Sequence, residues 1–238
     1  MNTIIKSALH KIGIDVRKRR NCPEYSLLGI RQMPIETILD IGANTGQFAR
    51  DIRKHFPEAA IVCFEPLPDA HRNLKSWADG DGRALALNCA LGDEEGTVSM
   101  YRHTEHSVSS SLLSTTKEGE ALYPKTIAQE SIEVAVRRLD EIPEVSSGRL
   151  RGDVLVKIDV QGYEDRVICG GRATIGAAKA CIVELNVAHL YDGQCGIYSL
   201  MGLFDELGFS YAGNLTQVCS PTDGRVVYVD AVFFSRSM

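Results

Sequence analysis

Two short segments of this 238-residue chain combine acids and glycines in patterns that suit the binding of a charged small molecule. The first, residues 40–46 (DIGANTG), lies where an apolar strand is expected to turn into a helix. In doubly wound folds a nucleotide binds at this turn, because the carboxyl end of the strand opens into a crevice. Gly42 and Gly46 allow close approach of the backbone, and Asn44 tolerates a left-handed conformation. The segment therefore predicts a nucleotide-binding turn.

The charge at this turn separates two classes of ligand. Asp40 directly precedes the glycine, where it would repel the pyrophosphate that a dinucleotide places at the helix N-terminus. The third glycine of a GxGxxG motif is also missing, since Gln47 follows Gly46. S-adenosylmethionine carries an ammonium and a sulfonium but no phosphate, so Asp40 would attract it, directly or through water. Glu65, at the end of the next expected strand, is placed to accept both hydroxyls of a ribose.

The second segment, VLVKIDVQGYE, places Lys157 and Asp159 on one face of an apolar strand. Because an unpaired buried charge is costly, these two side chains either pair with neighbours or face a ligand. We expect Asp159 to face the sulfonium and the acceptor, since ligands bind at the carboxyl ends of such strands. For Lys157 both interpretations stay open. Glu164 starts the following helix, where an acid also favours the helix dipole.

If the ligand is S-adenosylmethionine, transfer of its methyl group to a hydroxyl would benefit from a general base within hydrogen-bond reach. Asp159 is the first candidate, and His189 after the fifth strong strand is the second. Glu184 and Asn186 share a face if that strand continues. Asp159, Glu184 and His189 would also suit a hard divalent cation, but no spacing signature supports a metal site, and none is expected.

A polar, aperiodic stretch at about 102–130 interrupts the pattern of strands and helices. A loop approaching 30 residues in a compact domain is usually a functional lid or an insert. Its small hydroxyl donors, suited to a sugar or polyol, are Ser109, Ser110 and Ser111. His103 and His106 are alternative bases on composition alone.

Strands and helices alternate along most of the chain from residue 35 onward. Strands are expected at 36–42, 59–66, 83–91, 153–160 and 178–186, with helices at 46–56, 69–78, 163–171 and 198–209. Residues 96–102 and 131–139 alternate like a half-exposed antiparallel pair. The pattern predicts a doubly wound, mainly parallel, seven-stranded Rossmann-like α/β sheet with helices on both faces and an antiparallel C-terminal hairpin.

Composition narrows the class of protein. An apolar fraction of 44% and a charged fraction of 24% are typical of a globular domain. A net charge of −5 argues against a nucleic-acid partner. The chain has no apolar run long enough to span a bilayer. Its N-terminal segment also lacks the features of a signal peptide. Seven cysteines without a CxxC pair indicate reduced thiols and a cytoplasmic location.

The beginning of the chain differs from the rest in charge. Residues 1–34 are expected to form a basic, amphipathic helical extension before a catalytic domain at 35–238. Apolar residues recur at helical spacing in its first part, and basic residues gather at 17–20. Such a segment either contacts an anionic membrane surface through residues 1–20 or packs its apolar stripe on the domain, and the second is favoured.

These motifs together resemble those of the FkbM-type methyltransferases, Rossmann-like enzymes that depend on S-adenosylmethionine. The segments ILDIGANTGQF, CFEP, NCALGD, SSSL, VRRLDEI and VKIDVQGYE occur in the same order between about Thr37 and Glu184. Many members of this family carry glutamate where Gln161 stands here. The resemblance implies methyl transfer to a hydroxyl of a sugar, a polyketide or another small metabolite.

The resemblance also implies roles for individual residues. The cofactor would contact Asp40, Gly42, Ala43, Asn44, Gly46, Glu65, Pro66, Asn88, Cys89 and Asp159, with the adenine near Leu67 and Ala90. Asn88 is equally well explained as a turn-forming asparagine. From the residues themselves, we expect the acceptor to contact Ser109, Ser110, Ser111, Gln161 and Glu184, and the catalytic set to be Asp159, His189 and Lys157.

Two other functions stay open at this point. The first is an NAD-type oxidoreductase, against which Asp40 and the imperfect glycine motif argue. The second is a catalytically silent binding module that keeps the methyltransferase fold. Retention of Asp40, Glu65 and Asp159 argues against the silent module.

Overall fold

The structure, a computed structural model, describes residues 7, 9–14, 16, 18, 22–145 and 150–237. Its strands are β1 (Ile35–Ile41), β2 (Ala60–Phe64), β3 (Ala84–Leu87), β4 (Ala90–Leu91), β5 (Gly96–His103), β6 (Gln129–Arg137), β7 (Asp153–Ile158), β8 (Ala180–Asn186), β9 (Phe209–Cys219) and β10 (Val226–Ser235). Its α-helices are α2 (Pro23–Ser26), α3 (Gln47–Arg53), α4 (Pro68–Asp81), α5 (Lys117–Leu122), α6 (Glu164–Gly170), α7 (Arg172–Gly176) and α8 (Ile197–Glu206). Short 3₁₀ helices are η2 (Leu27–Gln32), η3 (Ser107–Ser109), η4 (Pro124–Thr126) and η5 (Leu139–Glu141).

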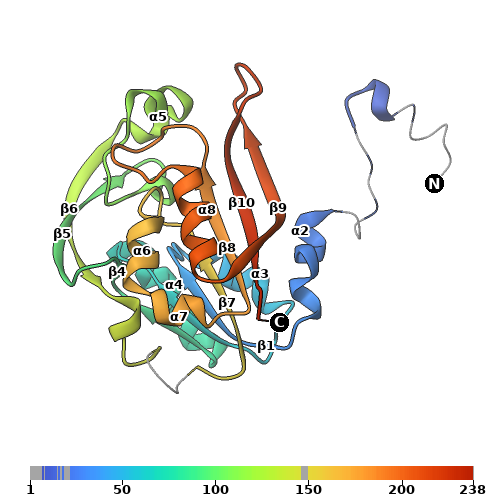
Figure 1. The fold of residues 1–238 in the computed structure, drawn as a ribbon. Coiled ribbons are helices and arrows are strands. Elements are labelled where there is room, and N and C mark those ends of the chain that lie inside the picture. The colour runs from blue at the N-terminus through green and yellow to red at the C-terminus, as the bar shows by residue number, and fades with distance from the viewer. Residues whose placement is uncertain are drawn as a thin grey trace.

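Seven strands form the main sheet in the order β3-β2-β1-β7-β8-β10-β9 (Figure 1). The pairings from β3 to β8 are parallel, whereas β10 runs antiparallel to both β8 and β9. The predicted doubly wound sheet with an antiparallel C-terminal hairpin is thus confirmed. The chain order reverses between β1 and β7, and in such sheets a ligand crevice opens at the carboxyl ends of the two strands that flank this reversal.

Helices cover both faces of the sheet, as predicted, because successive strand residues point to opposite sides. In β1, Ile38 packs in one buried cluster with Ile52 of α3 and Leu74 of α4. The next residue, Leu39, packs in a second cluster with Phe204 of α8. Figure 1 shows α6, α7 and α8 in front of the sheet and α3 and α4 behind it. The central strands are therefore covered on both sides, and their carboxyl ends are where a site can open.

The expected strand at 83–91 is wrong as a single element. Its first part, β3, pairs with β2 in the main sheet, whereas β4 pairs with β6 in a second sheet of order β4-β6-β5. The chain turns at Asn88, whose side-chain amide donates to the backbone carbonyls of Glu65 and Pro66 at 2.9 and 3.0 Å. The predicted antiparallel pair is confirmed as β5 and β6.

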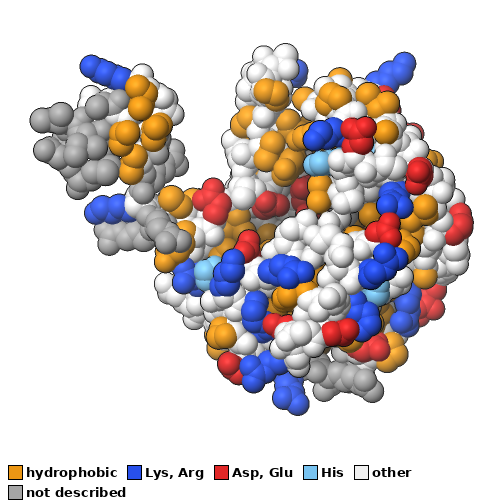
Figure 2. Space-filling view, turned by 180° about the vertical axis from the view of Figure 1, so that it is seen from behind, with side chains coloured by type: hydrophobic (Ala, Val, Ile, Leu, Met, Phe, Trp, Pro, Cys, Tyr) orange, Lys and Arg blue, Asp and Glu red, His pale blue; other side chains and the backbone are white. Residues whose placement is uncertain are grey.

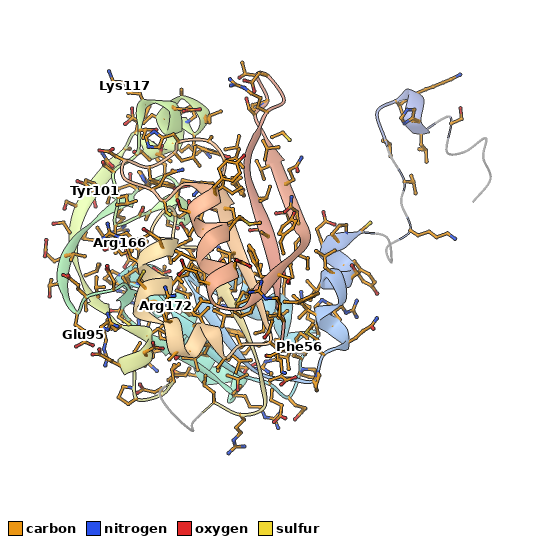
Figure 3. The ribbon with its side chains drawn as sticks, in the orientation of Figure 1. Phe56, Glu95, Tyr101, Lys117, Arg166 and Arg172 are labelled. Atoms are coloured by element: carbon orange, nitrogen blue, oxygen red, sulfur yellow. The ribbon has the colours of Figure 1, made fainter. Side chains whose placement is uncertain are left out.

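The polar stretch at 102–130 runs between β5 and β6 and contains η3, α5 and η4. Tyr101 on β5 and Lys117 on α5, both labelled in Figure 3, mark where it leaves the second sheet and where its helix begins. It is packed rather than open, since His103 and Ser111 are fully buried. A bridge between Thr115 and Tyr191 ties it to the segment after β8. That it closes over a ligand as a lid stays a prediction.

Only part of the predicted N-terminal extension is described. The described α2 and η2 lie beside β9, where Leu27 and Ile30 pack in the same buried cluster as Leu215. The apolar positions Ile4, Ile5 and Ala8 and the basic positions Lys6, Arg17, Arg19 and Arg20 lie outside the described residues. Within the part of the chain that is described, no helix is long and apolar enough to cross a membrane.

Candidate functional site

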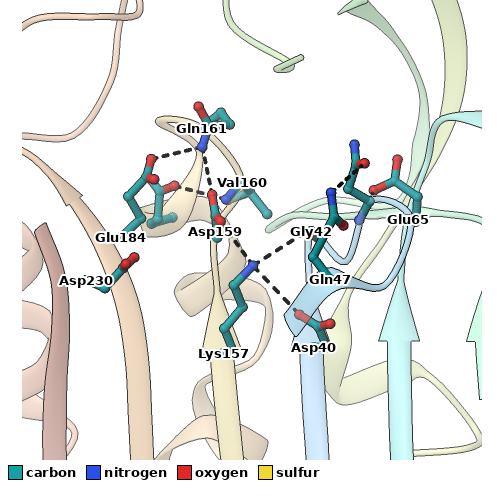
Figure 4. Close-up of polar contacts among 12 residues, drawn as sticks. Asp40, Gly42, Gln47, Glu65, Lys157, Asp159, Val160, Gln161, Glu184 and Asp230 are labelled. Carbon is teal, nitrogen blue, oxygen red and sulfur yellow. Dashed lines mark hydrogen bonds and ion pairs between the residues drawn. The ribbon is translucent and has the colours of Figure 1, made fainter. Parts of the chain in front are cut away.

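The two predicted motifs meet at the point where the strand order reverses. Asp40 on β1 and Lys157 on β7 are partners in the parallel ladder. Lys157 Nζ lies 3.7 Å from Asp40 Oδ1 and 3.0 Å from Asp159 Oδ2, and it donates to the carbonyl of Gly42 at 3.5 Å (Figure 4). Burial alone lowers the pKa of Lys157, but the two carboxylates outweigh it and hold that pKa above its usual range. The lysine is therefore the cation between two acids.

Asp40 lies behind the ligand-binding surface rather than on it. Its side chain is fully buried, and neither carboxyl oxygen has a hydrogen-bond partner among the described residues. Burial raises the pKa of Asp40, and the charge of Lys157 opposes that shift. A direct contact between Asp40 and a ligand does not fit this position, so its charge acts through Lys157.

The glycine turn packs directly against the end of β7. Gly42, Asn44 and Gly46 have φ angles of +80°, +46° and +89°, which confirms the left-handed conformation predicted for Asn44. A Cβ atom on Gly42 would lie only 1.8 Å from the backbone oxygen of Asp159. The backbone N–H of Asp159 donates to the carbonyl of Ile41 at 3.0 Å. Position 42 therefore needs glycine for both its conformation and its packing.

Glu65 is held in place by the backbone around it. Its Oε2 accepts from the N–H of Asn44 at 2.7 Å, and its Oε1 accepts from the N–H of Leu67 at 2.8 Å. The side chain is 4% exposed, and burial raises its pKa to about 7. The carboxylate at the end of β2 is thus oriented before any ligand arrives.

A cavity of about 530 Å³, the Glu65 cavity, lies at the carboxyl ends of β1 and β2. Its polar lining includes Asn44, Glu65, Ser110 and Asp159, and its apolar lining includes Pro66, Leu67, Cys89, Ala90 and Met100. None of its described lining residues is Lys or Arg. Asn88 does not line it, because that side chain is exposed and its amide serves the turn described above.

A second cavity of about 610 Å³, the Glu184 cavity, lies on the other side of Asp159. It is lined by Asp159, Gln161 and Glu184 together with Tyr123, Tyr191 and Tyr228. The 102–130 segment contributes His106, Ser109 and Thr115 to its wall. The described lining has no Lys or Arg here either, so this cavity offers carboxylates, an amide, phenols, hydroxyls and the imidazole of His106.

Gln161 joins the carboxylates of this cavity. Its Nε2 donates to Asp159 Oδ1 at 2.7 Å and to Glu184 Oε1 at 2.9 Å (Figure 4). Its Oε1 accepts from the hydroxyl of Tyr191 at 2.6 Å. The residue itself has a positive φ of 59°. The neutral side-chain amide of Gln161 therefore lies between the carboxyl groups of Asp159 and Glu184 and donates to both.

Glu184 is a buried carboxyl on β8, opposite Asp230 of β10 in the ladder. Burial raises the pKa of Glu184 well above its usual range, and the nearby charges of Asp159, Glu164 and Asp230 raise it further. Lys157 opposes these effects.

A third and more open hollow of about 1110 Å³, the Lys157 cavity, begins at the glycine turn. Its lining includes Gly42, Ala43, Lys157 and Asp230, and the hydroxyl of Thr216 donates to Asp230. Figure 2 shows acidic side chains around a recess beside the C-terminal hairpin on this face of the molecule. Asp159 and Val108 line all three cavities, and Asp159 is the ionisable residue at which they meet.

The three predicted serines have different surroundings. Ser110 lines the Glu65 cavity, and Ser109 lines the Glu184 cavity, where its hydroxyl lies 2.7 Å from His106 Nδ1. Ser111 is fully buried and lines neither of them. Its hydroxyl donates to the carbonyl of Gln161 at 2.7 Å and accepts from the N–H of Leu113 at 3.0 Å. Ser111 therefore orders the Gln161 loop instead of contacting an acceptor.

His189 does not join the acids, and its predicted role as a base is not supported. The side chain is exposed and lines a separate groove with Asp223 and Arg225. The chain turns away after β8, which places Tyr191 rather than His189 against Gln161. Across the described residues, no group of three or more His, Cys, Asp or Glu side chains is placed to hold a metal ion.

Two other candidates also have structural surroundings. His103 is fully buried and lines none of the three cavities. Glu164 Oε1 accepts from the N–H groups of Val160 and Gly162, both at 3.1 Å, and so closes the loop after β7. This explains Glu164 without a catalytic role.

Several residues that line these cavities were not found from the sequence. Tyr191 and Asp230 are the most informative of them, since they contact or face the acids. Tyr163 and Met100 line the Glu65 cavity, and Val108 lines all three cavities. These residues come from distant parts of the chain, and of them only Tyr163 lies in a quoted motif, VKIDVQGYE. Only the register of β8 and β10, which the hairpin pattern leaves open, would have placed Asp230 beside Glu184.

Comparison with known proteins agrees with this geometry. Residues 40–211 match the methyltransferase FkbM domain. The chain is 28% identical over 183 residues to the 2-O-methyltransferase NoeI of Sinorhizobium fredii (strain NBRC 101917 / NGR234), covering 74% of each chain. It is 26% identical over 188 residues to Methyltransferase 1 of Beauveria bassiana (strain ARSEF 2860), covering 74% of this chain and 72% of that one.

A solved structure shares the fold. A candidate S-adenosylmethionine dependent methyltransferase from Listeria monocytogenes superposes with a TM-score of 0.50 at 8% identity, over 90% of this chain and 98% of that one. The FkbM match spans most of the chain, including the glycine turn, the Lys157–Asp159 segment and β8. The chain belongs to the FkbM methyltransferase family.

Proposed function

We propose that this methyltransferase is an S-adenosylmethionine-dependent O-methyltransferase that acts on a hydroxyl of a small metabolite or of a sugar or glycan precursor. The observation that carries the proposal is the position of Asp159. It stands where the cavity of Glu65 meets the cavity of Glu184, so one side can take a donor and the other an acceptor.

The residues of the Glu65 cavity fit S-adenosylmethionine. The oriented carboxylate of Glu65 would hold the ribose hydroxyls, and the slot around Leu67, Cys89 and Met100 would take the adenine. The methionine part would lie along Gly42 and Ala43, where the Lys157 cavity begins. When bound, the cofactor supplies an electrophilic methyl group on a sulfonium.

The charges favour this donor over a dinucleotide. A pyrophosphate needs cations or free backbone N–H groups, and no described residue lining the Glu65 cavity is Lys or Arg. The N–H of Asn44, at the start of the turn, is already bonded to Glu65. The NAD-type alternative is therefore the weaker one, and membership in a methyltransferase family supports the same choice.

The chain positions the reacting groups rather than supplying a nucleophile of its own. Lys157 and Gln161 hold the carboxylate of Asp159 from two sides, so its orientation at the junction is fixed. Buried surroundings exclude water, and fixed groups lower the entropic barrier to an in-line displacement. Transfer to oxygen is supported by the relative from Sinorhizobium fredii, which is a 2-O-methyltransferase.

Calorimetric titration tests the proposal. We expect saturable, one-to-one binding of S-adenosylmethionine and no binding of NAD at the same concentrations. Absence of S-adenosylmethionine binding at millimolar concentration would overturn the proposal. Binding without methyl transfer to any member of a panel of hydroxylated acceptors would instead favour the silent binding module.

A further inference from the structure

We propose that Glu184, and not Asp159, receives the proton of the acceptor hydroxyl, which reaches it through the Glu184 cavity. This inference rests on the proposed O-methyl transfer and assigns a role within that site. Glu184 would accept the proton, while Asp159 stands at the junction of the cavities, and the amide of Gln161 bonds to both.

The hydrogen bonds of the two carboxylates differ. Both oxygens of Asp159 are engaged, Oδ1 by Gln161 at 2.7 Å and Oδ2 by Lys157 at 3.0 Å. Glu184 accepts one hydrogen bond at Oε1, again from Gln161. No described residue makes a hydrogen bond or an ion pair with its Oε2. Glu184 therefore keeps an oxygen that accepts no hydrogen bond from a described residue, whereas each oxygen of Asp159 already has a donor.

The position of Glu184 fits an acceptor more than a donor. It lines its own cavity but not the Glu65 cavity. A hydroxyl that hydrogen-bonds to Glu184 Oε2 would lie beside Asp159, because a single nitrogen of Gln161 touches both carboxylates. The reacting oxygen would thus stand between the base and the junction of the cavities.

The surroundings of Glu184 make its carboxylate a stronger proton acceptor than that of an ordinary glutamate. The titratable groups that face it from the neighbouring elements are Asp159, Lys157, Glu164, Asp230, Tyr123, Tyr191 and Tyr228. Burial and the three acids raise the pKa of Glu184, and only Lys157 opposes them. A carboxylate whose pKa is raised has a larger driving force for taking up the proton of the acceptor hydroxyl.

The proposed step balances in atoms and charge. The O–H bond of the acceptor breaks, and its proton passes to Glu184. The oxygen's electron pair forms the new bond to the methyl carbon, while the electron pair of the broken carbon–sulfur bond stays on sulfur as a neutral thioether. Glu184 then releases its proton to solvent.

The test compares E184Q with E133Q, the same change at an exposed position of β6. Glutamine keeps the size of the side chain and an oxygen for Gln161, so both variants should fold. With the methyl glycoside that accepts most label in a panel, we expect E184Q to lower kcat by about 10²–10⁴-fold with little change in KM. It should also remove the acidic limb of the kcat–pH profile measured at saturating S-adenosylmethionine, where donor affinity no longer matters, and E133Q and D159N should keep that limb. Normal turnover and an unchanged acidic limb in E184Q would overturn the proposal.

A second readout needs neither donor nor acceptor. In an infrared pH titration of the cofactor-free protein, wild type should show Glu65, Glu164 and Glu184 protonating above the usual range of glutamate, because burial raises the pKa of each. The spectrum of E184Q should lack one of these carboxyl signals, whereas E133Q should keep all of them. An E184Q spectrum that keeps every wild-type signal would also overturn the proposal. Because this measurement does not depend on S-adenosylmethionine, it separates failure of the Glu184 assignment from failure of the proposed function.

Discussion

The hydroxyl of Tyr191 lies 2.6 Å from Gln161 Oε1, and this contact decides which end of the amide faces the acids. A phenol that donates to Oε1 leaves Nε2 pointing at Asp159 and Glu184. A flipped amide would place its oxygen against two carboxylates, which repel it. Tyr191 therefore orients the centre of the site through Gln161.

Removal of this hydroxyl should loosen the amide. We predict that Y191F lowers kcat by about 5–30-fold, because it removes a hydroxyl that contacts both Gln161 and the carbonyl of Ser109, an effect of about 1–2 kcal/mol. Steady-state methyl transfer measures the effect. The matched control is Y211F, which removes an exposed hydroxyl that donates to Asn214. Equal activity of the two variants would show that Gln161 needs no orienting partner.

Lys157 should be important for stability as well as for the site. K157M leaves Asp40 buried without its cation, so we predict a loss of about 3–5 kcal/mol in the free energy of unfolding. An unpaired buried acid destabilises the fold only where it must ionise. The loss should therefore shrink below about pH 4, where the carboxyl is protonated in the folded and the unfolded chain.

Urea unfolding at several pH values measures this effect, and the double variant D40N/K157M is its control. When Asp40 is replaced as well, the free energy of unfolding should fall by about 1–3 kcal/mol less than it does in K157M. A double variant as unstable as K157M would contradict the pairing of Asp40 with Lys157.

The glycine turn should tolerate no side chain at position 42. A Cβ there would collide with the Asp159 backbone at a φ angle of +80°, so G42A should destabilise the fold by more than about 2 kcal/mol. It should also weaken binding of S-adenosylmethionine. The control is G80A, in α4, where a Cβ meets no atom within 4 Å. That variant should gain about 0.5–1 kcal/mol from helix propensity, as chemical unfolding would show.

Glu65 should make stability and donor binding depend on pH in opposite directions. Its pKa is about 7 in the fold because of burial, against about 4.3 in an unfolded chain. The stability that it contributes is therefore present below about pH 4 and lost as the pH rises through 7. The ionised form accepts ribose hydroxyls better, so donor affinity should rise over the same range.

The variant E65Q tests both effects. The fall in unfolding free energy between about pH 4 and 7 should become shallower but not vanish, since Glu164 also has a pKa raised to about 7 by burial. Affinity for S-adenosylmethionine should drop about 10-fold or more, as expected for hydrogen bonds to a charged group. Calorimetry at pH 6 and 8 measures the second effect, and unchanged affinity would remove Glu65 from the donor site.

The sequence predicted the parts of the site that lie at strand ends. Asp40, Glu65 and Asp159 each follow an apolar strand, and the carboxyl ends of parallel strands meet at one edge, so their convergence was foreseeable. The left-handed turn at Asn44 followed from residue type and position. Local periodicity was sufficient for these features.

The features that escaped prediction depend on contacts between distant segments. The side chain of Tyr191 reaches Gln161 across 30 positions in the sequence, and no spacing rule indicates that contact. His189 is two residues away from Tyr191 in the chain, yet the backbone turns after β8, and the side chain of His189 lies in a separate groove. Lone polar residues in loops have no periodicity to place them.

The central claim is that a methyl group passes from S-adenosylmethionine to a hydroxyl at the junction marked by Asp159. Its most direct test is transfer of labelled methyl to a panel of hydroxylated acceptors by wild type and by D159N. We predict label on an acceptor oxygen with wild type, and at least about 100-fold less with D159N although that variant still binds the donor. Wild type that binds the donor but labels no acceptor, or D159N that transfers at the normal rate, would contradict the account.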